Sequence, residues 1–179
     1  MRLTSIFLFL TLICCKSETK NDPDTKNAVE SMWTNFKKAH PEVQKEQPES
    51  YFFHDNKKDA DRLAKLILDG KKKAGSGLYL WYEEAKAPLP EVGTKIIVTN
   101  FEGIPQAIIE TTKVDTIPFN KVSSNYAQMD MGTEIDALNK WKKAHWDFFA
   151  NAMEESGEQP TETMLIVCER FKTIWPEKK

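Results

Sequence analysis

Apolar residues recur at helical spacing in three segments of the chain. In residues 59–69 they return every three or four positions, and Gly70 follows, which predicts a helix with a glycine just beyond its end. Residues 135–152 carry a longer stripe of aromatic and aliphatic positions and predict the longest helix. Residues 29–38 present one apolar face shortly before Pro41, so we expect a further helix there.

Aromatic and β-branched residues gather in four other segments, which predict strands. These segments are residues 77–81, 95–99, 104–114 and 164–175. Asn100 to Gly103 is typical of a hairpin turn between the second and third strands, because Gly103 can adopt a positive φ. The helices do not alternate one for one with the strands. The pattern therefore predicts an α+β domain.

The first residues resemble a bacterial export signal. One basic residue, Arg2, precedes about ten apolar residues, too few to cross a hydrocarbon core of ~30 Å. The segment ends Leu12-Ile13-Cys14-Cys15, which resembles a lipobox, although Cys14 occupies the position where Gly, Ala or Ser is usual. This places lipidation, by chains such as palmitate, on Cys15. Plain secretion and a cytosolic location are the alternatives.

The lipobox interpretation divides the chain into three parts. Residues 1–14 are expected to be a lipoprotein signal peptide, and residues 15–27 a flexible tether, because residues 16–27 include no aliphatic or aromatic residue. Residues 28–179 then form a single domain. The expected location is the bacterial cell envelope, with the membrane reached only through the lipid.

Composition and charge exclude several classes of protein. The 179 residues are 40% hydrophobic and include ten Phe, which excludes a disordered chain. Lys and Arg total 25 against 27 Asp and Glu, a net charge of −2, and loss of Arg2 with the signal would make it −3. A net negative charge gives no overall drive toward nucleic acid. The three histidines and Cys168 show no zinc-ligand spacing, so no metal or other cofactor is expected, and His145 is predicted to be a packing histidine.

Five strings of residues together resemble the ASCH domain, a PUA-like small β-barrel with flanking helices. They occur in order at residues 60–72, 89–93, 109–114, 141–149 and 168–171. The resemblance covers roughly Met32 to Pro176 and implies a cleft beside the barrel that binds RNA or nucleotides. It also implies a possible activity, since some small members are amidohydrolases that remove the acetyl group of N4-acetylcytidine.

The resemblance implies a catalytic Lys/Thr/Glu arrangement, with Lys and Thr in a Gly-x-Lys-x-x-Thr string. In this sequence the Lys is Lys72, the Thr position holds Gly75, and Ser76 is the nearest hydroxyl. The acidic member maps onto Asp130, in a segment expected to be a loop. A hydrolase would then use Lys72 as base, Ser76 as nucleophile and Asp130 as acid or base. The alternative is that these charged groups are simply solvated.

Five side chains are candidates for ligand binding, each with a structural alternative. Lys72 and Lys73 could meet an anionic or carbonyl group, and Trp81 could stack on a base although it falls in a predicted strand. Glu110 interrupts an apolar strand and would need a partner inside a barrel. Arg170 could anchor a ligand or pair with a structural carboxylate.

We therefore expect a membrane-tethered, monomeric, non-catalytic module that binds a small nucleotide-like or polar ligand. The first alternative is an amidohydrolase of small N-acylated substrates such as N4-acetylcytidine, and the second is RNA binding.

Overall fold

The computed structural model describes residues 17–18, 23–43, 45–154 and 157–177, and the predicted signal peptide with Cys15 lies outside them. Its strands are β1 (Ser17–Glu18), β2 (Ser50–Phe52), β3 (Ala74–Leu78), β4 (Lys95–Thr99), β5 (Pro105–Pro118) and β6 (Leu165–Trp175). Its helices are α1 (Pro23–Ala39), α2 (Lys57–Leu68), α3 (Tyr79–Ala85), α4 (Ser124–Met131) and α5 (Ala137–Glu154), with a 3₁₀ turn at Phe119–Lys121.

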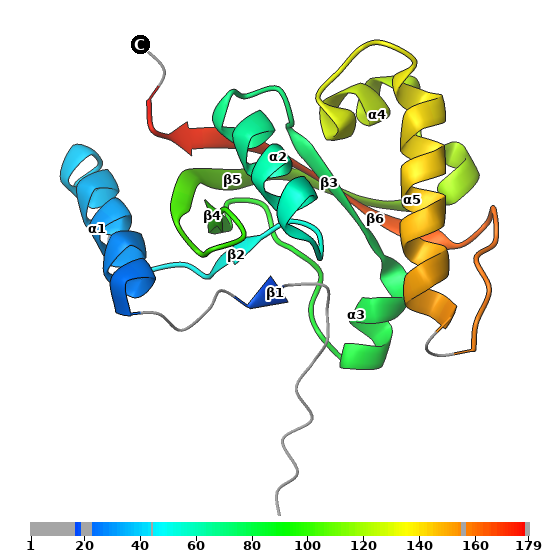
Figure 1. Cartoon of the computed structure of the whole chain (residues 1–179), viewed down its shortest axis with the longest axis horizontal. Helices are drawn as coiled ribbons and strands as arrows, with labels where there is room; N and C mark the ends of the chain where they lie inside the picture. The colour runs from blue at the N-terminus through cyan, green and yellow to red at the C-terminus, as the bar shows by residue number, and fades with distance from the viewer. Residues whose placement is uncertain (1–16, 19–22, 44, 155–156, 178–179) are drawn as a thin grey trace, which may run out of the picture.

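The strands form one sheet in the order β1-β2-β4-β5-β6-β3. Its centre is antiparallel, because β5 pairs with both β4 and β6, whereas β2 runs parallel to β4. The sheet curls without closing within the described residues, and β1 and β3 are its edges (Figure 1). The predicted α+β class is thus confirmed, and the expected small barrel takes the form of an open half-barrel.

Helices cover both faces of this sheet. Successive residues of a strand point to opposite faces, so Ile96 and Val98 pack with α2 while Ile97 packs with α1. A third buried cluster joins α4 and α5 to β3 and β6 around Trp141, which is fully buried. In Figure 1 α1 lies at one end of the sheet, α4 and α5 lie at the other, and α2 lies between them.

Most predicted elements are present, with shifted ends. The hairpin turn is confirmed, since Gly103 has φ 87° and its N–H donates to Asn100 O at 3.0 Å. Helix α1 begins at Pro23, inside the expected tether, because proline suits the first helical position and Asp24 favours the positive end of the helix dipole. The sequence also missed β2, which lies at the end of an expected loop.

The predicted strand at residues 77–81 is right for its first two residues and wrong for residues 79–81. Strand β3 ends at Leu78 and residues 79–85 form helix α3, which closes with Lys86 in the left-handed conformation. A short apolar run cannot be assigned to strand or helix by periodicity alone. As a consequence Trp81 lies on a helix.

Candidate functional site

Asp130 lies at the centre of the candidate site, on a helix rather than in the expected loop. Helix α4 is short and lacks an apolar stripe, but both its ends are marked. Ser123 Oγ accepts the N–H of Tyr126 at 3.2 Å, and Gly132 takes the left-handed conformation at the other end. These caps hold Asp130, which is 1% exposed, against β3 and α5.

Side chains from three segments converge on the Asp130 carboxylate. The Lys72 ammonium donates to Oδ1 and also to the Asp130 main-chain carbonyl at 2.9 Å. Ser76 Oγ donates to Oδ2 at 2.6 Å, and Trp141 Nε1 donates to the same oxygen at 2.7 Å. His145 Nε2 lies 3.3 Å from Oδ2. Oδ2 thus has three side-chain partners and Oδ1 has one.

This environment keeps Asp130 ionised. Burial by itself would raise the pKa of the carboxyl, but the charges of Lys72 and His145 and their hydrogen bonds outweigh burial and hold the pKa well below its usual range. His145 is oriented for this contact because its Nδ1 donates to the Trp141 carbonyl at 2.9 Å and its ring stacks on Trp141. The carboxylate is thus a charged anchor for four side chains.

Tyr126 completes the polar cluster next to β3. Its hydroxyl donates to the Gly75 carbonyl at 2.5 Å and lies 3.0 Å from Ser76 Oγ. Burial first, and then the charge of Asp130, raises the pKa of Tyr126 well above its ordinary value. The Tyr126 phenol is thus a neutral group that donates its proton to the Gly75 carbonyl, and Ser76 donates its proton to Asp130. Ser76 Oγ therefore keeps a lone pair that can accept a hydrogen bond.

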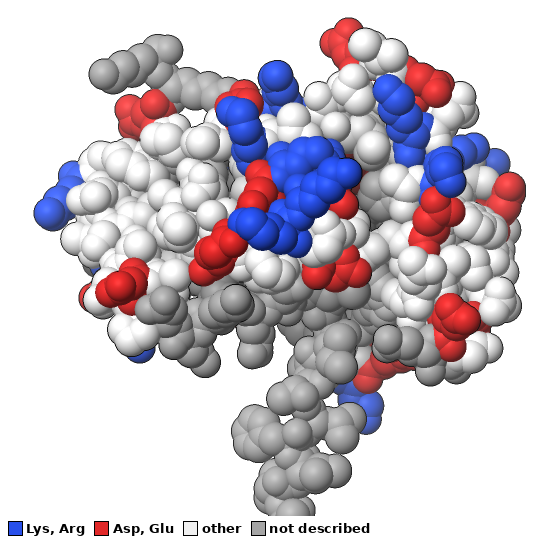
Figure 2. All heavy atoms as spheres, in the orientation of Figure 1, with Lys and Arg blue, Asp and Glu red and all other residues white. Residues whose placement is uncertain are grey.

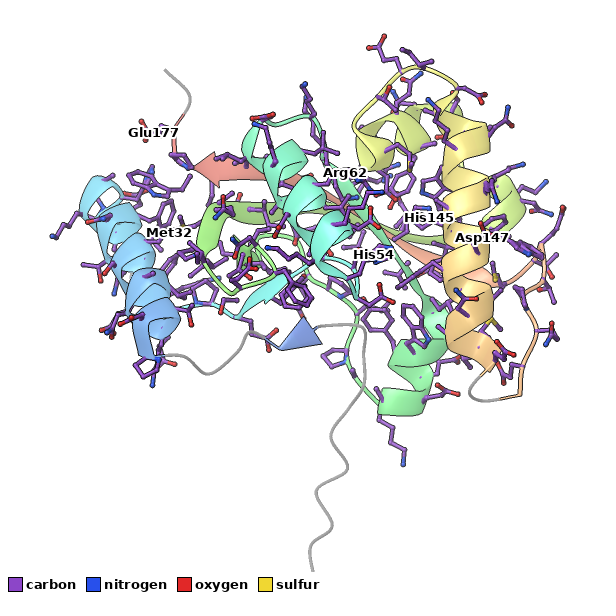
Figure 3. All side chains as sticks on the ribbon, viewed as in Figure 1. Met32, His54, Arg62, His145, Asp147 and Glu177 are labelled. Atoms are coloured by element: carbon purple, nitrogen blue, oxygen red, sulfur yellow. The ribbon has the colours of Figure 1, made fainter. Side chains whose placement is uncertain are left out.

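A cavity of about 980 Å³ opens beside this cluster. Helices α2 and α5 form its two sides, and β3, α3, the end of α4 and the β2–α2 loop also contribute to the lining. In Figure 3 His54 and Arg62 lie on the α2 side of this space and His145 lies on the α5 side. Aromatic rings of Phe53, Trp81 and Phe148 face the cavity, whose volume is in the range of small-molecule sites.

The structure brings together four of the residues predicted from sequence. Lys72, Ser76, Asp130 and Trp81 all line the cavity. Lys72 is 5% exposed, unlike the lysines on either side of it. Gly75 also lines the cavity. Because Gly75 and Ser76 are consecutive residues of β3, they face opposite sides of the strand. Ser76 therefore does not occupy the place that a threonine at position 75 would take.

Three other predicted residues lie outside the lining of this cavity. Lys73 is exposed, and its backbone bonds to Met129 and Phe171. Glu110 pairs with two lysines, Lys95 at 2.7 Å and Lys172 at 2.8 Å. Burial would raise the pKa of Glu110, but these hydrogen bonds lower it on balance.

Arg170 meets a carboxylate and a ring. Its guanidinium donates to Asp115 and lies 5.1 Å from the centre of the Tyr126 ring. The structural alternative that the sequence left open for Arg170 matches these contacts. Arg170 thus supports Tyr126 from behind the site.

Sequence patterns missed the part played by His145. It was predicted only to pack, yet it contacts Asp130 and lines the cavity. Its spacing of four residues from Trp141 was the available signal, because residues one turn apart share a helix face and can reach one carboxylate. Within the described residues, no group of three His, Cys, Asp or Glu is arranged to hold a metal ion.

The fold and cavity define a small α+β module of the binding or hydrolase type. The chain belongs to the ASCH domain family, whose model matches residues 49–175. It is similar to the crystal structure of protein EF3133 from Enterococcus faecalis V583, with 32% identity and a TM-score of 0.75 over 83% of this chain and 89% of that one.

It is also similar to an ASCH domain from Lactobacillus crispatus JV V101, with 31% identity and a TM-score of 0.74 over 85% of this chain and 94% of that chain. A search of curated proteins finds no match to the chain.

Proposed function

We propose that this protein is a non-catalytic binding module whose cavity takes a small, flat, nucleoside-like ligand. The observation that carries the proposal is the cavity of about 980 Å³, which joins aromatic walls to the polar groups around Asp130. Flat rings suit stacking on aromatic faces, and Ser76 Oγ offers an acceptor to a polar edge.

The same geometry argues against catalysis. A general base works best with a pKa near the operating pH, and the pKa of Asp130 is held far below it. Lys72 would have to give up its proton to act as a base, and the buried Asp130 carboxylate would then lose the charge that compensates it. The position that carries the family's threonine holds Gly75, which has no hydroxyl.

A thermal-shift titration of the full chain with nucleosides tests this proposal. We expect at least one nucleoside to stabilise the protein, by about 2.7 kcal/mol at one hundred times its Kd. Ribose is the control, since it lacks a ring to stack. No stabilisation by any nucleoside at millimolar concentration would contradict the proposal.

An amidohydrolase is the second candidate, because Ser76 Oγ lies 2.6 Å from Asp130 Oδ2 with Lys72 on the other carboxylate oxygen. We expect the wild type to release no more acetate from N4-acetylcytidine than Ser76→Ala does. Turnover that Ser76→Ala abolishes would refute the non-catalytic assignment.

Gly75→Thr is the matched gain-of-function variant in that assay. A Cβ at this position would lie 3.4 Å from Phe53 Cε1. This is a close contact, but the Phe53 ring is partly exposed and has room to move. Acetate release by Gly75→Thr but not by the wild type would show that the site is inactive because position 75 lacks a hydroxyl.

We also propose that the protein is exported and held at the envelope membrane by lipid on Cys15. We further propose that it is a monomer and that nucleic acid is not its partner. The lipobox-like string supports the anchor, and the negative net charge weighs against RNA. No helix in the described part of the chain is long and apolar enough to span a membrane. If the Cys15→Ser variant still incorporates alkyne-tagged palmitate, the proposed anchor at Cys15 is refuted. A molecular mass by light scattering that equals a dimer would refute the monomer.

A further inference from the structure

The charges that line the cavity are unequal. Five carboxylates line it, against one lysine, one arginine and two histidines. His54 contacts Asp55 at 2.6 Å and His145 contacts Asp130 at 3.3 Å. The lysine and the arginine are likewise bound to carboxylates of the same lining. Arg62 donates to Asp59 Oδ1 through Nε at 3.1 Å and Nη2 at 2.8 Å, and Lys72 donates to Asp130. The lining therefore has no uncommitted cation for a phosphate.

The three remaining carboxylates each stand beside an aromatic ring of the wall. Glu84 follows Trp81 by three residues on α3, which places both on one helix face. Asp147 directly precedes Phe148 on α5. Asp147 pairs with Lys143 at 2.9 Å, but that lysine is 80% exposed and outside the lining, so its effect is screened by solvent.

The third carboxylate, Asp55, is next to His54 and accepts a contact from its Nδ1 at 2.6 Å. The His54 ring lies 5.2 Å from that of Phe148, and Trp81 meets Phe148 edge-on at 6.1 Å. These three rings thus form one continuous wall with carboxylates along it.

Lysines on the outer surface do not reverse this balance. Figure 2 shows Lys and Arg side chains gathered over α2, close to the carboxylates of the same helix. Lys57 pairs with Asp61 at 2.9 Å and with Glu102, and Lys65 pairs with Asp69 at 3.3 Å. These ion pairs offset part of the positive charge of this surface.

We infer that the cavity selects a planar heteroaromatic ring that carries a positive charge, such as a ring-methylated nucleoside base, over its neutral parent and over phosphate-bearing forms. Aromatic faces attract cations through their quadrupole, and carboxylates in a partly enclosed cavity concentrate them. This inference rests on the proposed function and names its ligand class.

The test compares 7-methylguanosine with guanosine and guanosine 5′-monophosphate, by calorimetry on the full chain at pH 6. The two nucleosides differ by one methyl group and one positive charge. We expect 7-methylguanosine to bind about tenfold more tightly than guanosine, and the monophosphate to bind more weakly than either. The preference should shrink as salt is raised, because partly exposed charges are screened.

Variants locate the effect. Glu84→Gln combined with Asp55→Asn should reduce the preference to about twofold, because it removes two of the carboxylates that attract the cationic ring. Glu91→Gln, an exposed carboxylate outside the cavity, is the matched control and should change nothing.

Equal or tighter binding of guanosine overturns the inference and leaves the proposed function intact. Binding of neither nucleoside also overturns the inference, and the proposed function falls with it only if no other nucleoside stabilises the protein in the thermal-shift titration. A preference that persists in the double variant overturns the assignment to these carboxylates.

Discussion

Replacing Asp130 with alanine is expected to lower the unfolding free energy by about 3–5 kcal/mol. The cause is the Lys72 ammonium, which is buried and would lose the carboxylate that compensates its charge. Trp141 Nε1 and Ser76 Oγ would lose their acceptor at the same time. Urea unfolding at pH 7 measures the loss.

Two variants separate charge from hydrogen bonding. Ser76→Ala should cost only about 1 kcal/mol, because Asp130 keeps its other donors. Adding Lys72→Met to Asp130→Ala should recover part of the loss, since no buried charge then remains. A loss for Asp130→Ala no larger than that for Ser76→Ala would contradict the anchor role.

The ion pair also predicts how stability depends on pH. The pKa of Asp130 is lower in the folded protein than its ordinary value of 3.8, so below about pH 4 the unfolded chain binds a proton that the folded chain does not. Its contribution is therefore complete above that range and is lost as the pH falls through and below it. Asp130→Asn should remove this component of the acid dependence, which urea midpoints from pH 6 to pH 2.5 would show.

Replacing Trp81 with alanine is expected to weaken nucleoside binding by about 1–3 kcal/mol, or roughly 5- to 150-fold in Kd, because the indole forms part of the aromatic wall. Calorimetry with the nucleoside that stabilises most strongly measures this change. Trp81→Phe keeps an aromatic face and should retain most of the affinity, which distinguishes stacking from damage to the packing against Phe149. Unchanged affinity in Trp81→Ala would remove Trp81 from the site.

Much of the fold follows from the sequence, because its longest elements bury continuous apolar faces. The α5 stripe and the β6 segment were placed within two or three residues of their true ends. Helix α4 was missed because it buries Tyr126 and Asp130 without a periodic apolar stripe. In the sequence, only its capping residues indicate a helix there.

The site was harder to predict because it depends on contacts between distant segments. The sequence of three consecutive lysines, residues 71–73, does not indicate which of them is buried. The N–H groups of Lys71 and Lys72 both donate to Leu66 O, yet the Lys72 side chain is the one that donates to Asp130 on α4. Arg170 and Glu110 drew attention for their charge, yet their partners come from neighbouring strands and are visible only once the register is known.

The most direct test of the central claim is a nuclear magnetic resonance titration of the full chain with the stabilising nucleoside. Our account predicts that the Trp81 indole N–H resonance shifts at saturation, with nuclear Overhauser contacts from the ligand ring to Phe148, while the Trp33 indole on α1 stays unmoved. Shifts gathered around Trp33, or no contact between the ligand and Phe148, would contradict the claim that the cavity between α2 and α5 is the binding site.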